Sequence, residues 1–473
     1  MMLLRRGEFH RFVADGSAHV YLVPSAAVFR LDEASTAILD ALGNDDVAPP
    51  DLEQRLADRF PLADVRDTIT ELLSTRAIKT VDGVVPVARP ELPKKRIPLT
   101  TLVLNVTSKC NLSCKYCYEY GEDRLSEPVN KPRFMNEQTA RDSVDFMFAE
   151  AGEQEHVHLT FFGGETLLNF KVLQSALAYA KERAGALGKT VDASLTTNAT
   201  LLRDEIIDWM VDNDIGVTVS MDGAREQQDE LRVFANGMGS YDIIAPKVKE
   251  LLRRHRSRPI GARVTLTKNN LNVREIYRHL KDELGFYEVG FAPVTTSWQR
   301  DYAIQDDGFE RMLGEFQLLA QEYLATSLEG RHHGFSNVRD TLEEIHRGVA
   351  KAYPCGAGIG LLGVATDGDV ALCHRFAGSD THKLGTVTGG IDRDRQDDYL
   401  LKHHIANKTD CATCWARSLC AGGCYHEANT RYGSTESPNL HYCDWIRRWS
   451  ATCLEVYATL SAQRPDFLRQ FEA

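Results

Sequence analysis

Three closely spaced cysteines are the clearest sign of chemistry in this sequence. Cys110, Cys114 and Cys117 stand in "SKCNLSCKYCYEY" with the spacing C-x3-C-x2-C. Thiolates are soft metal ligands, and three of them are one fewer than a closed zinc site or a fully ligated [4Fe–4S] cluster needs. They could therefore hold three irons of such a cluster and leave the fourth iron open. A zinc ribbon fits less well because it uses paired C-x2-C hairpins, and three reduced thiols packed in a loop would need no cofactor.

The other eight cysteines form a second group toward the C-terminus. They lie between residues 355 and 453, in "CGAGIGLLGVATDGDVALC", in "CATCWARSLCAGGC" and at two later positions. Cysteines that only fill a core would be scattered along the chain, whereas ligands cluster. A zinc module is one interpretation of this group, but zinc would use only four of the thiolates. Iron–sulfur clusters account for more of them.

Composition places these cysteines in a reducing compartment. The chain has 473 residues, a formal net charge of −12, and no apolar run approaching the roughly 20 residues that cross a bilayer. Its start, "MMLLRRGEFHRF", lacks the apolar core and the cleavage site of an export signal. We therefore expect a cytoplasmic protein that binds neither membranes nor nucleic acid, with cysteines that are reduced rather than paired in disulfides.

Residues 100–300 show the alternation of strands and helices that is typical of a parallel sheet covered by helices. The predicted strands are residues 101–106, 157–162, 192–197, 215–221, 260–267 and 287–294, and the predicted helices are 137–150, 170–187, 203–213, 241–255 and 272–283. Six units are too few to close an eight-stranded barrel, so we predict an open, partial (β/α)6 barrel in the α/β class. The first cysteine group follows the first strand, at the end where parallel barrels build active sites.

This arrangement resembles the radical S-adenosylmethionine (SAM) superfamily, whose signature is C-x3-C-x2-C after a first strand. The resemblance implies that the open iron binds the amino and carboxylate groups of SAM. It also implies that an electron from the cluster cleaves SAM to a 5′-deoxyadenosyl radical, which abstracts hydrogen from a substrate. A reductant such as flavodoxin or ferredoxin would supply that electron.

Residues at the ends of the following strands match positions that contact SAM in that superfamily. The matched residues are Tyr116, Gly163, Gly164, Glu165, Asn198, Ser220 and Arg232. The resemblance places Tyr116 near the adenine, lets Glu165 accept a hydrogen bond from the methionine amine and pairs Arg232 with the SAM carboxylate. Each match is weak alone, and their joint order and spacing carry the assignment. The sequence identifies no catalytic acid or base.

The second cysteine group resembles the SPASM domain, which houses two auxiliary iron–sulfur clusters. The resemblance implies three [4Fe–4S] clusters in all, with one auxiliary cluster held by Cys411, Cys414, Cys420 and Cys443, and the other by Cys355, Cys373 and Cys424. The latter cluster has only three evident ligands. Cys453 could be its fourth ligand, but the apolar spacing around Cys453 favours a buried helix thiol, and a substrate thiolate could bind the vacant iron instead. We expect His374 to have a supporting or structural role rather than to be a ligand.

The remaining parts of the chain precede and follow the predicted barrel in the sequence. Residues 1–90 contain short strands and amphipathic helices, and they resemble the winged-helix-like peptide-recognition domain related to the PQQ-pathway peptide chaperone. Such a unit implies that a leader peptide adds a strand to a sheet edge. A DNA-binding winged helix is the alternative, but a basic recognition stretch is missing. Residues 301–350 are predicted to be a helical connector, and residues 351–473 the SPASM domain.

The sequence around the later cysteines is similar to that of thioether-forming peptide maturases, above all the family that matures quinohaemoprotein amine dehydrogenase. That resemblance implies crosslinks from a cysteine sulfur to methylene carbons of Asp or Glu in a ribosomal polypeptide that carries a leader segment. Maturation of six-cysteine peptides through Cys–Thr thioethers and formylglycine formation in sulfatases are the alternative reactions. A zinc-stabilised peptide chaperone is the alternative without catalysis.

Overall fold

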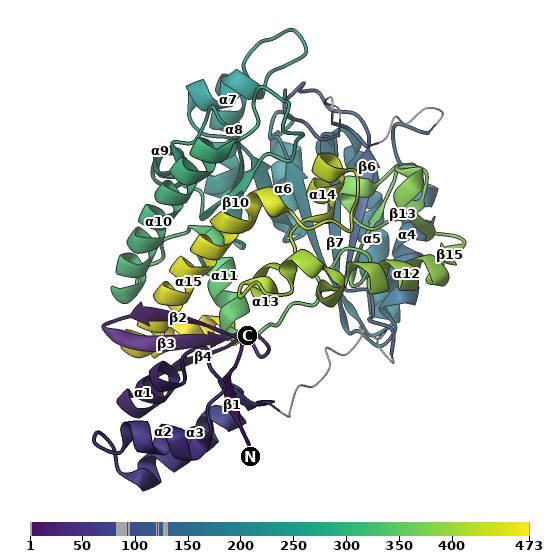
Figure 1. Ribbon diagram of the computed structural model, residues 1–473. Coiled ribbons are helices and arrows are strands. Elements are labelled where there is room, and N and C mark those ends of the chain that lie inside the picture. The colour runs from purple at the N-terminus through teal and green to yellow at the C-terminus, as the bar shows by residue number, and fades with distance from the viewer. Residues whose placement is uncertain are drawn as a thin grey trace.

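The computed structural model describes residues 2–81, 92, 95–119, 121, 123–125 and 131–472. Its centre is a run of six adjacent parallel strands in the order β11-β10-β9-β8-β7-β6 (Figure 1). These strands are β6 (Thr101–Thr107), β7 (His156–Gly163), β8 (Thr190–Thr197), β9 (Gly216–Ser220), β10 (Ile260–Leu266) and β11 (Glu288–Pro293). The predicted partial barrel of the α/β class is confirmed, and each strand lies within two residues of its predicted bounds.

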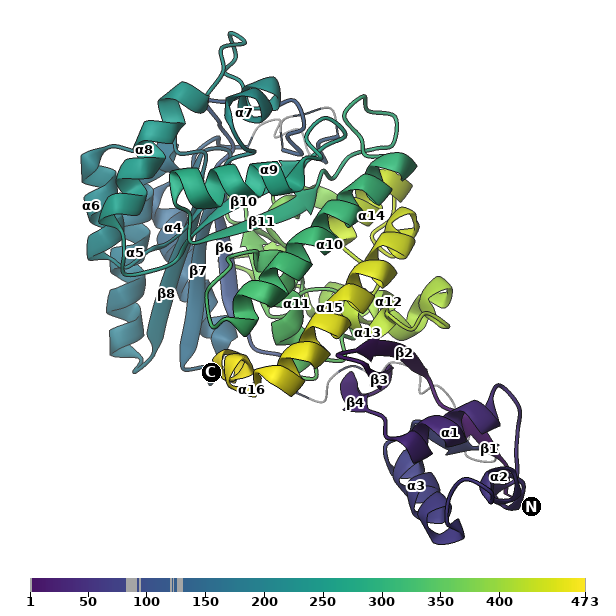
Figure 2. The same cartoon turned by 90° about the vertical axis from the view of Figure 1, so that its left-hand side faces the viewer.

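Helices cover the outer face of this sheet (Figure 2). They are α4 (Glu137–Ala151), α5 (Phe170–Ala186), α6 (Asp204–Asp212), α8 (Tyr241–Arg254) and α9 (Val273–Arg278), which continues as the π-helix η3 (His279–Leu284). Strand β10 illustrates the alternation that this packing requires: Ala262, Val264 and Leu266 are buried in the core. The residues between them face the hollow side of the sheet, because successive side chains point to opposite faces.

The cysteine-rich region extends the central sheet. Strand β12 (Leu361–Val364) pairs in parallel with β6, and β13 (Asp369–Ala371), β14 (Lys383–Thr386) and β15 (Gly390–Ile391) follow as antiparallel neighbours. The sequence did not predict this continuation. It brings the segment after β13, which begins with Cys373, close to β6 and the first cysteine group.

Three helices connect the region after the barrel with the C-terminal part of the chain. They are α10 (Asp306–Leu328), α11 (Ser336–His346) and α15 (Cys443–Gln463), so the predicted helical stretch at 301–350 is present. The ring of Phe316 on α10 lies edge-on, 5.3 Å from the rings of both Trp445 and Trp449 on α15. Within the described ranges, no helix is both long and apolar enough to cross a membrane.

The N-terminal unit contains two small sheets rather than one. Strands β2 (Phe9–Ala14), β3 (Ser17–Leu22) and β4 (Ala27–Arg30) form an antiparallel sheet, and β1 (Leu4–Arg6) pairs with β5 (Ile78–Thr80) beside α1 (Glu33–Leu42), α2 (Pro49–Leu56) and α3 (Leu62–Ser74). Alternate residues of β3 serve two cores, since Val20 packs with the three helices and Tyr21 packs with the main body. Figure 2 shows β2–β4 lying between these helices and α15. Residues 82–91, 93 and 94, between this unit and β6, lie outside the described residues.

Candidate functional site

The carboxyl ends of the parallel strands surround a cavity of about 1390 Å³. Its wall includes all three cysteines of the first group and six of the seven residues that the sequence matched to SAM contacts. The shared lining residues are Cys110, Cys114, Cys117, Tyr116, Gly163, Gly164, Asn198, Ser220 and Arg232. Residues more than 100 positions apart in the chain therefore meet in one place, as the topology of a parallel barrel predicts.

Backbone hydrogen bonds attach the first cysteine loop to the segment that carries Arg232. Ser113 N donates to Val233 O at 2.7 Å, and Lys115 N donates to Leu231 O at 3.0 Å. Burial raises the pKa of Cys110 to about 11 and also raises that of Cys114. Such thiols become thiolates only beside a positive group, so the site suits a cationic metal centre that replaces their protons.

Arg232 is the buried cation of this wall. Its Nη1 donates a 2.6 Å hydrogen bond to the Tyr116 hydroxyl, which in turn donates to the carboxylate of Asp222. The Nε of Arg232 is buried and has no hydrogen-bond partner among the described residues. A guanidinium with a donor to spare can bind a carboxylate that enters the cavity.

Glu165 differs from the sequence-based expectation, because it does not line the cavity. It is almost fully buried, and its Oε1 accepts hydrogen bonds from Thr197 Oγ1 at 2.7 Å and Leu167 N at 3.1 Å. Its Oε2 accepts from Asn198 N at 2.7 Å. In this geometry the carboxylate holds the turn after β8, which presents Asn198 to the cavity.

Gly163 ends β7 at a point where the backbone of β6 comes very near. A Cβ at this position would lie 2.3 Å from the carbonyl oxygen of Thr107, and the φ angle of 132° also favours glycine. Gly164 N donates to the same carbonyl at 3.0 Å. The glycine pair therefore keeps the cavity edge open beside the cysteine loop.

The later cysteines influence one another electrostatically in two groups, Cys355 with Cys373 and Cys424, and Cys411 with Cys414, Cys420 and Cys443. Burial, together with the nearby thiols of Cys424 and Cys355, raises the pKa of Cys373 to about 12. Burial raises the pKa of Cys411 to about 11, with contributions from the thiols of the other set: Cys420, Cys443 and Cys414. Within the described ranges, no three His, Cys, Asp or Glu side chains converge as they would around a single metal ion.

Cys453 belongs to neither set. It is fully buried on α15, and its thiol interacts with the side chain of Thr341 on α11. This position agrees with the interpretation that Cys453 is a core thiol.

The residues after Cys373 connect the cysteine trio Cys355, Cys373 and Cys424 with the cavity. His374 and Arg375 both line the cavity. Burial, with the charge of Arg375, lowers the pKa of His374 to about 3, and the His374 ring lies 4.5 Å from that of Phe162. Arg375 donates a 2.9 Å hydrogen bond to Thr295 Oγ1. Sequence reasoning missed Arg375, although its place two residues after a cysteine was a usable signal.

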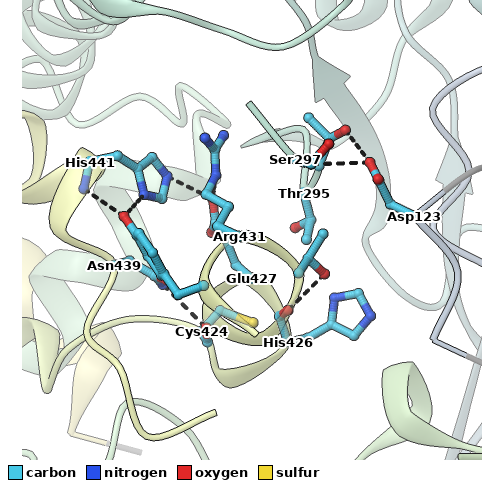
Figure 3. Close-up of polar contacts among 12 residues, drawn as sticks. Asp123, Thr295, Ser297, Cys424, His426, Glu427, Arg431, Asn439 and His441 are labelled. Atoms are coloured by element: carbon cyan, nitrogen blue, oxygen red, sulfur yellow. Dashed lines mark hydrogen bonds and ion pairs between the residues drawn. The ribbon is translucent and has the colours of Figure 1, made fainter. Parts of the chain in front are cut away.

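A buried polar network supports the third member of this trio (Figure 3). Asn439 Nδ2 donates to the carbonyl oxygen of Cys424 at 3.2 Å. On the following helix, α14 (Tyr425–Tyr432), the Glu427 carboxylate lies 3.1 Å from His441 Nε2 and 3.6 Å from Arg431 Nε. These contacts fix the start of α14 and with it the position of Cys424.

The cavity wall is strongly basic although the chain as a whole is acidic. Among the lining residues that the structure describes, eight are basic, namely Lys109, Lys115, Arg124, Lys131, Arg133, Arg232, Arg263 and Arg375, and only Glu119 is acidic. Lys131 is neutralised by ion pairs with Asp367, Asp369 and Asp380. The excess of positive charge favours anionic ligands.

Comparisons with known proteins agree with this architecture. Residues 104–283 match the Radical SAM superfamily. The chain is 27% identical over 373 residues to a serine-type anaerobic sulfatase-maturating enzyme of Bacteroides thetaiotaomicron, covering 73% of this chain and 86% of that protein.

Two solved structures share the fold. The structure of anSMEcpe with bound AdoMet and the Cp18Cys peptide has a TM-score of 0.63 at 20% identity and covers 79% of this chain and 99% of that chain. Streptococcus suis SuiB bound to S-adenosylmethionine has a TM-score of 0.50 at 15% identity and covers 92% of this chain and 98% of that chain.

Proposed function

We propose that this protein, which has the fold of a radical SAM enzyme, forms thioether crosslinks in a ribosomal polypeptide. The observation that carries the proposal is the single cavity shared by the three thiols of the first group, Arg232 and the Cys373–Arg375 segment. A radical generated on one side of such a cavity can act on a substrate held next to the second cysteine region.

Different residues of the chain would hold the cluster and contact SAM. Cys110, Cys114 and Cys117 would hold the cluster, whose bound SAM supplies the hydrogen-abstracting radical when reduced. The guanidinium of Arg232 would bind the SAM carboxylate, and Ser220 and Asn198 would contact the same molecule. Glu165 would act indirectly by holding the Asn198 turn.

The later cysteines would hold two auxiliary clusters, which brings the total to three [4Fe–4S] clusters. The trio of Cys355, Cys373 and Cys424 leaves one iron for a substrate thiolate, a soft ligand suited to it. Bond formation between a C–H carbon and an S–H sulfur removes two hydrogens. One would leave as the abstracted hydrogen atom and the other as a proton, and a cluster held by the trio could accept the remaining electron.

The substrate class follows from the resemblance to thioether-forming maturases, which points to Asp or Glu methylene carbons and, as one candidate, to the small subunit of quinohaemoprotein amine dehydrogenase. The basic cavity wall supports an acidic acceptor. Maturation of a six-cysteine peptide is the variant of this reaction with a Thr acceptor.

Formylglycine formation is the second candidate, because the matched Bacteroides thetaiotaomicron protein is a sulfatase-maturating enzyme. The products separate the two reactions. A thioether blocks alkylation of the substrate cysteine and leaves no carbonyl, whereas formylglycine reacts with hydroxylamine.

The test is anaerobic incubation of the reconstituted protein with SAM, dithionite and each polypeptide encoded beside its gene, followed by mass spectrometry. We expect loss of two hydrogens per crosslink, 5′-deoxyadenosine as co-product, and about twelve irons with equal acid-labile sulfide. Cys114→Ala should form no 5′-deoxyadenosine while it retains the auxiliary clusters, with Cys453→Ala as the matched control. Normal SAM cleavage by Cys114→Ala would refute the assignment, and zinc in place of iron would support the chaperone alternative.

A further inference from the structure

Arg263 projects into the cavity from the middle of the barrel wall. It lies on β10, where Ala262 and Val264 on either side are buried against the helices, so its side chain points to the hollow face and lines the cavity. It pairs with Ser220 on β9 and with Gly290 on β11. A Cβ at Gly290 would lie 3.1 Å from Nη1 of Arg263, so the glycine leaves room for the guanidinium.

This guanidinium has no partner in the part of the chain that the structure describes: it makes neither a side-chain hydrogen bond nor an ion pair there. The nearest charged influences are Arg375, which opposes its positive charge, and Asp340, which favours it without reaching ion-pair distance. A nearby arginine of the barrel is paired, by contrast. Arg258, just before β10, lies 2.6 Å from Asp192 and 2.9 Å from Asp214.

The side chain of Arg263 is exposed to the cavity, so its guanidinium is available to an anion that enters there, and the positive charge of Arg375 adds to the attraction. The ligand must be something other than the SAM carboxylate, for which Arg232 on the neighbouring part of the wall already has a spare donor. Arg263 adjoins Ser220, and adjacent strands are about 4.8 Å apart, so an anion on Arg263 would lie next to the SAM site.

We propose that Arg263 binds the side-chain carboxylate of the substrate residue that is modified, and so selects Asp or Glu over Asn or Gln. This inference rests on the proposed function and adds the residue that would determine acceptor specificity. The planar guanidinium matches a carboxylate through two parallel hydrogen bonds, whereas a neutral amide leaves the charge unpaired. The carboxylate is bonded to Cβ, the one methylene carbon of Asp, whereas in Glu it is bonded to Cγ and lies one carbon further from Cβ. Holding it would therefore restrict which C–H bond faces the radical source.

The first arm of the test measures binding alone, with the reconstituted holoenzyme, saturating SAM and no reductant. The probes are N-acetyl-aspartate methylamide and its asparagine counterpart, and saturation-transfer NMR reports their affinity. We expect the aspartate probe to bind about 10- to 100-fold more tightly than the asparagine probe, the range of a charged hydrogen-bonded pair. Arg263→Gln should abolish this preference, and Arg263→Lys should keep part of it.

Lys268→Gln is the matched control, because it removes an exposed positive charge five residues along the chain without altering the cavity wall. It should keep the full preference. Equal preference in Arg263→Gln and the wild-type protein would overturn the proposal. So would a loss of SAM binding in Arg263→Gln with the probe preference intact, because Arg263 would then serve SAM.

The second arm uses a polypeptide that the protein modifies, with the acceptor Asp or Glu changed to the corresponding amide. Wild-type protein should crosslink the acidic form at least tenfold faster, and Arg263→Gln should treat both forms alike. Failure to modify any polypeptide would count against the proposed function, and the binding arm would still decide the role of Arg263. Circular dichroism of Arg263→Gln and Arg263→Lys verifies that both variants fold.

Discussion

The hydroxyl of Tyr116 accepts a 2.6 Å hydrogen bond from Nη1 of Arg232 and donates to the carboxylate of Asp222, so one phenol positions the cation that faces the cavity. Tyr116 lies between Cys114 and Cys117, and its ring packs with Leu231 and Val294. The cysteine loop and Arg232 are therefore oriented together. Sequence reasoning placed Tyr116 near the adenine of SAM, and the structure adds this second role.

Tyr116→Phe should weaken SAM binding. The substitution removes both hydrogen bonds of the phenol, which costs about 1–3 kcal/mol and leaves Arg232 free to turn toward Asp222. We expect the Kd for SAM to rise about tenfold or more, measured by calorimetry on the reconstituted protein. Tyr179→Phe is the control, since the Tyr179 hydroxyl also donates to a carboxylate, that of Asp145, at 2.9 Å but away from the cavity. An unchanged Kd in Tyr116→Phe would show that this hydrogen-bond chain does not orient Arg232.

His333 should make the protein less stable in mild acid. Burial lowers the pKa of His333 to about 4, and its ring stacks on Tyr277 at 4.8 Å. Between pH 6.5 and 4 the unfolded chain binds a proton at this residue and the folded protein does not, so stability falls as the pH falls. The group can contribute up to about 3 kcal/mol over this range. His333→Phe retains an aromatic ring and should flatten the dependence of the unfolding midpoint on pH, by comparison with the wild-type protein. Parallel pH curves for the two proteins would contradict this prediction.

The sequence was most informative where the hydrophobic period was long and regular. The six barrel strands and the helices between them could be placed because each apolar run was bounded by polar turns. Strand β12 has only four residues, "LLGV", and its pairing with β6 joins segments about 260 positions apart, so no local pattern could reveal it.

For the candidate site, too, the sequence could predict some features and not others. Resemblance to the SPASM pattern suggested the cysteine sets, but the sequence could not show that Thr197, Leu167 and Asn198 donate hydrogen bonds to Glu165. The role of Arg263 could have been suspected, because "GARVTL" alternates in a way that turns an arginine toward the inside of the barrel. The direction of its side chain was readable, whereas its lack of a partner required the structure.

The edge of β4 is the candidate surface for a leader peptide. In the part of the chain that the structure describes, strand β4 pairs only with β3, and Phe29 on it is 42% exposed. An added peptide strand would bury that ring, so Phe29→Ser should weaken binding of a full-length substrate while SAM cleavage continues. Val13→Ser on β2 is the control, because Val13 is 67% exposed but lies at the opposite edge of the sheet, whose strand order is β2-β3-β4. Fluorescence anisotropy with a labelled leader peptide measures the affinity of both variants for that peptide. Deletion of the whole unit is a poorer test, since Tyr21 packs in the core of the main body.

The last prediction concerns the cysteine trio. Cys355, Cys373 and Cys424 lie close enough to interact electrostatically, while Cys453 is fully buried and bonded to Thr341 on α11. If the trio leaves one iron without a protein ligand, a substrate thiol should bind there, lose its proton and be held beside the cavity through the His374–Arg375 segment.

Two measurements follow. Cys453→Ala should keep its auxiliary clusters and its activity, because the thiol fills a core position and Ala costs stability rather than ligation. Addition of a cysteine-containing substrate should change the electron paramagnetic resonance spectrum of the reduced trio cluster, and the same peptide with Ser in place of Cys should not. An identical spectrum with both peptides, or loss of a cluster in Cys453→Ala, would mean that the protein supplies the fourth ligand and that the sulfur reacts unligated.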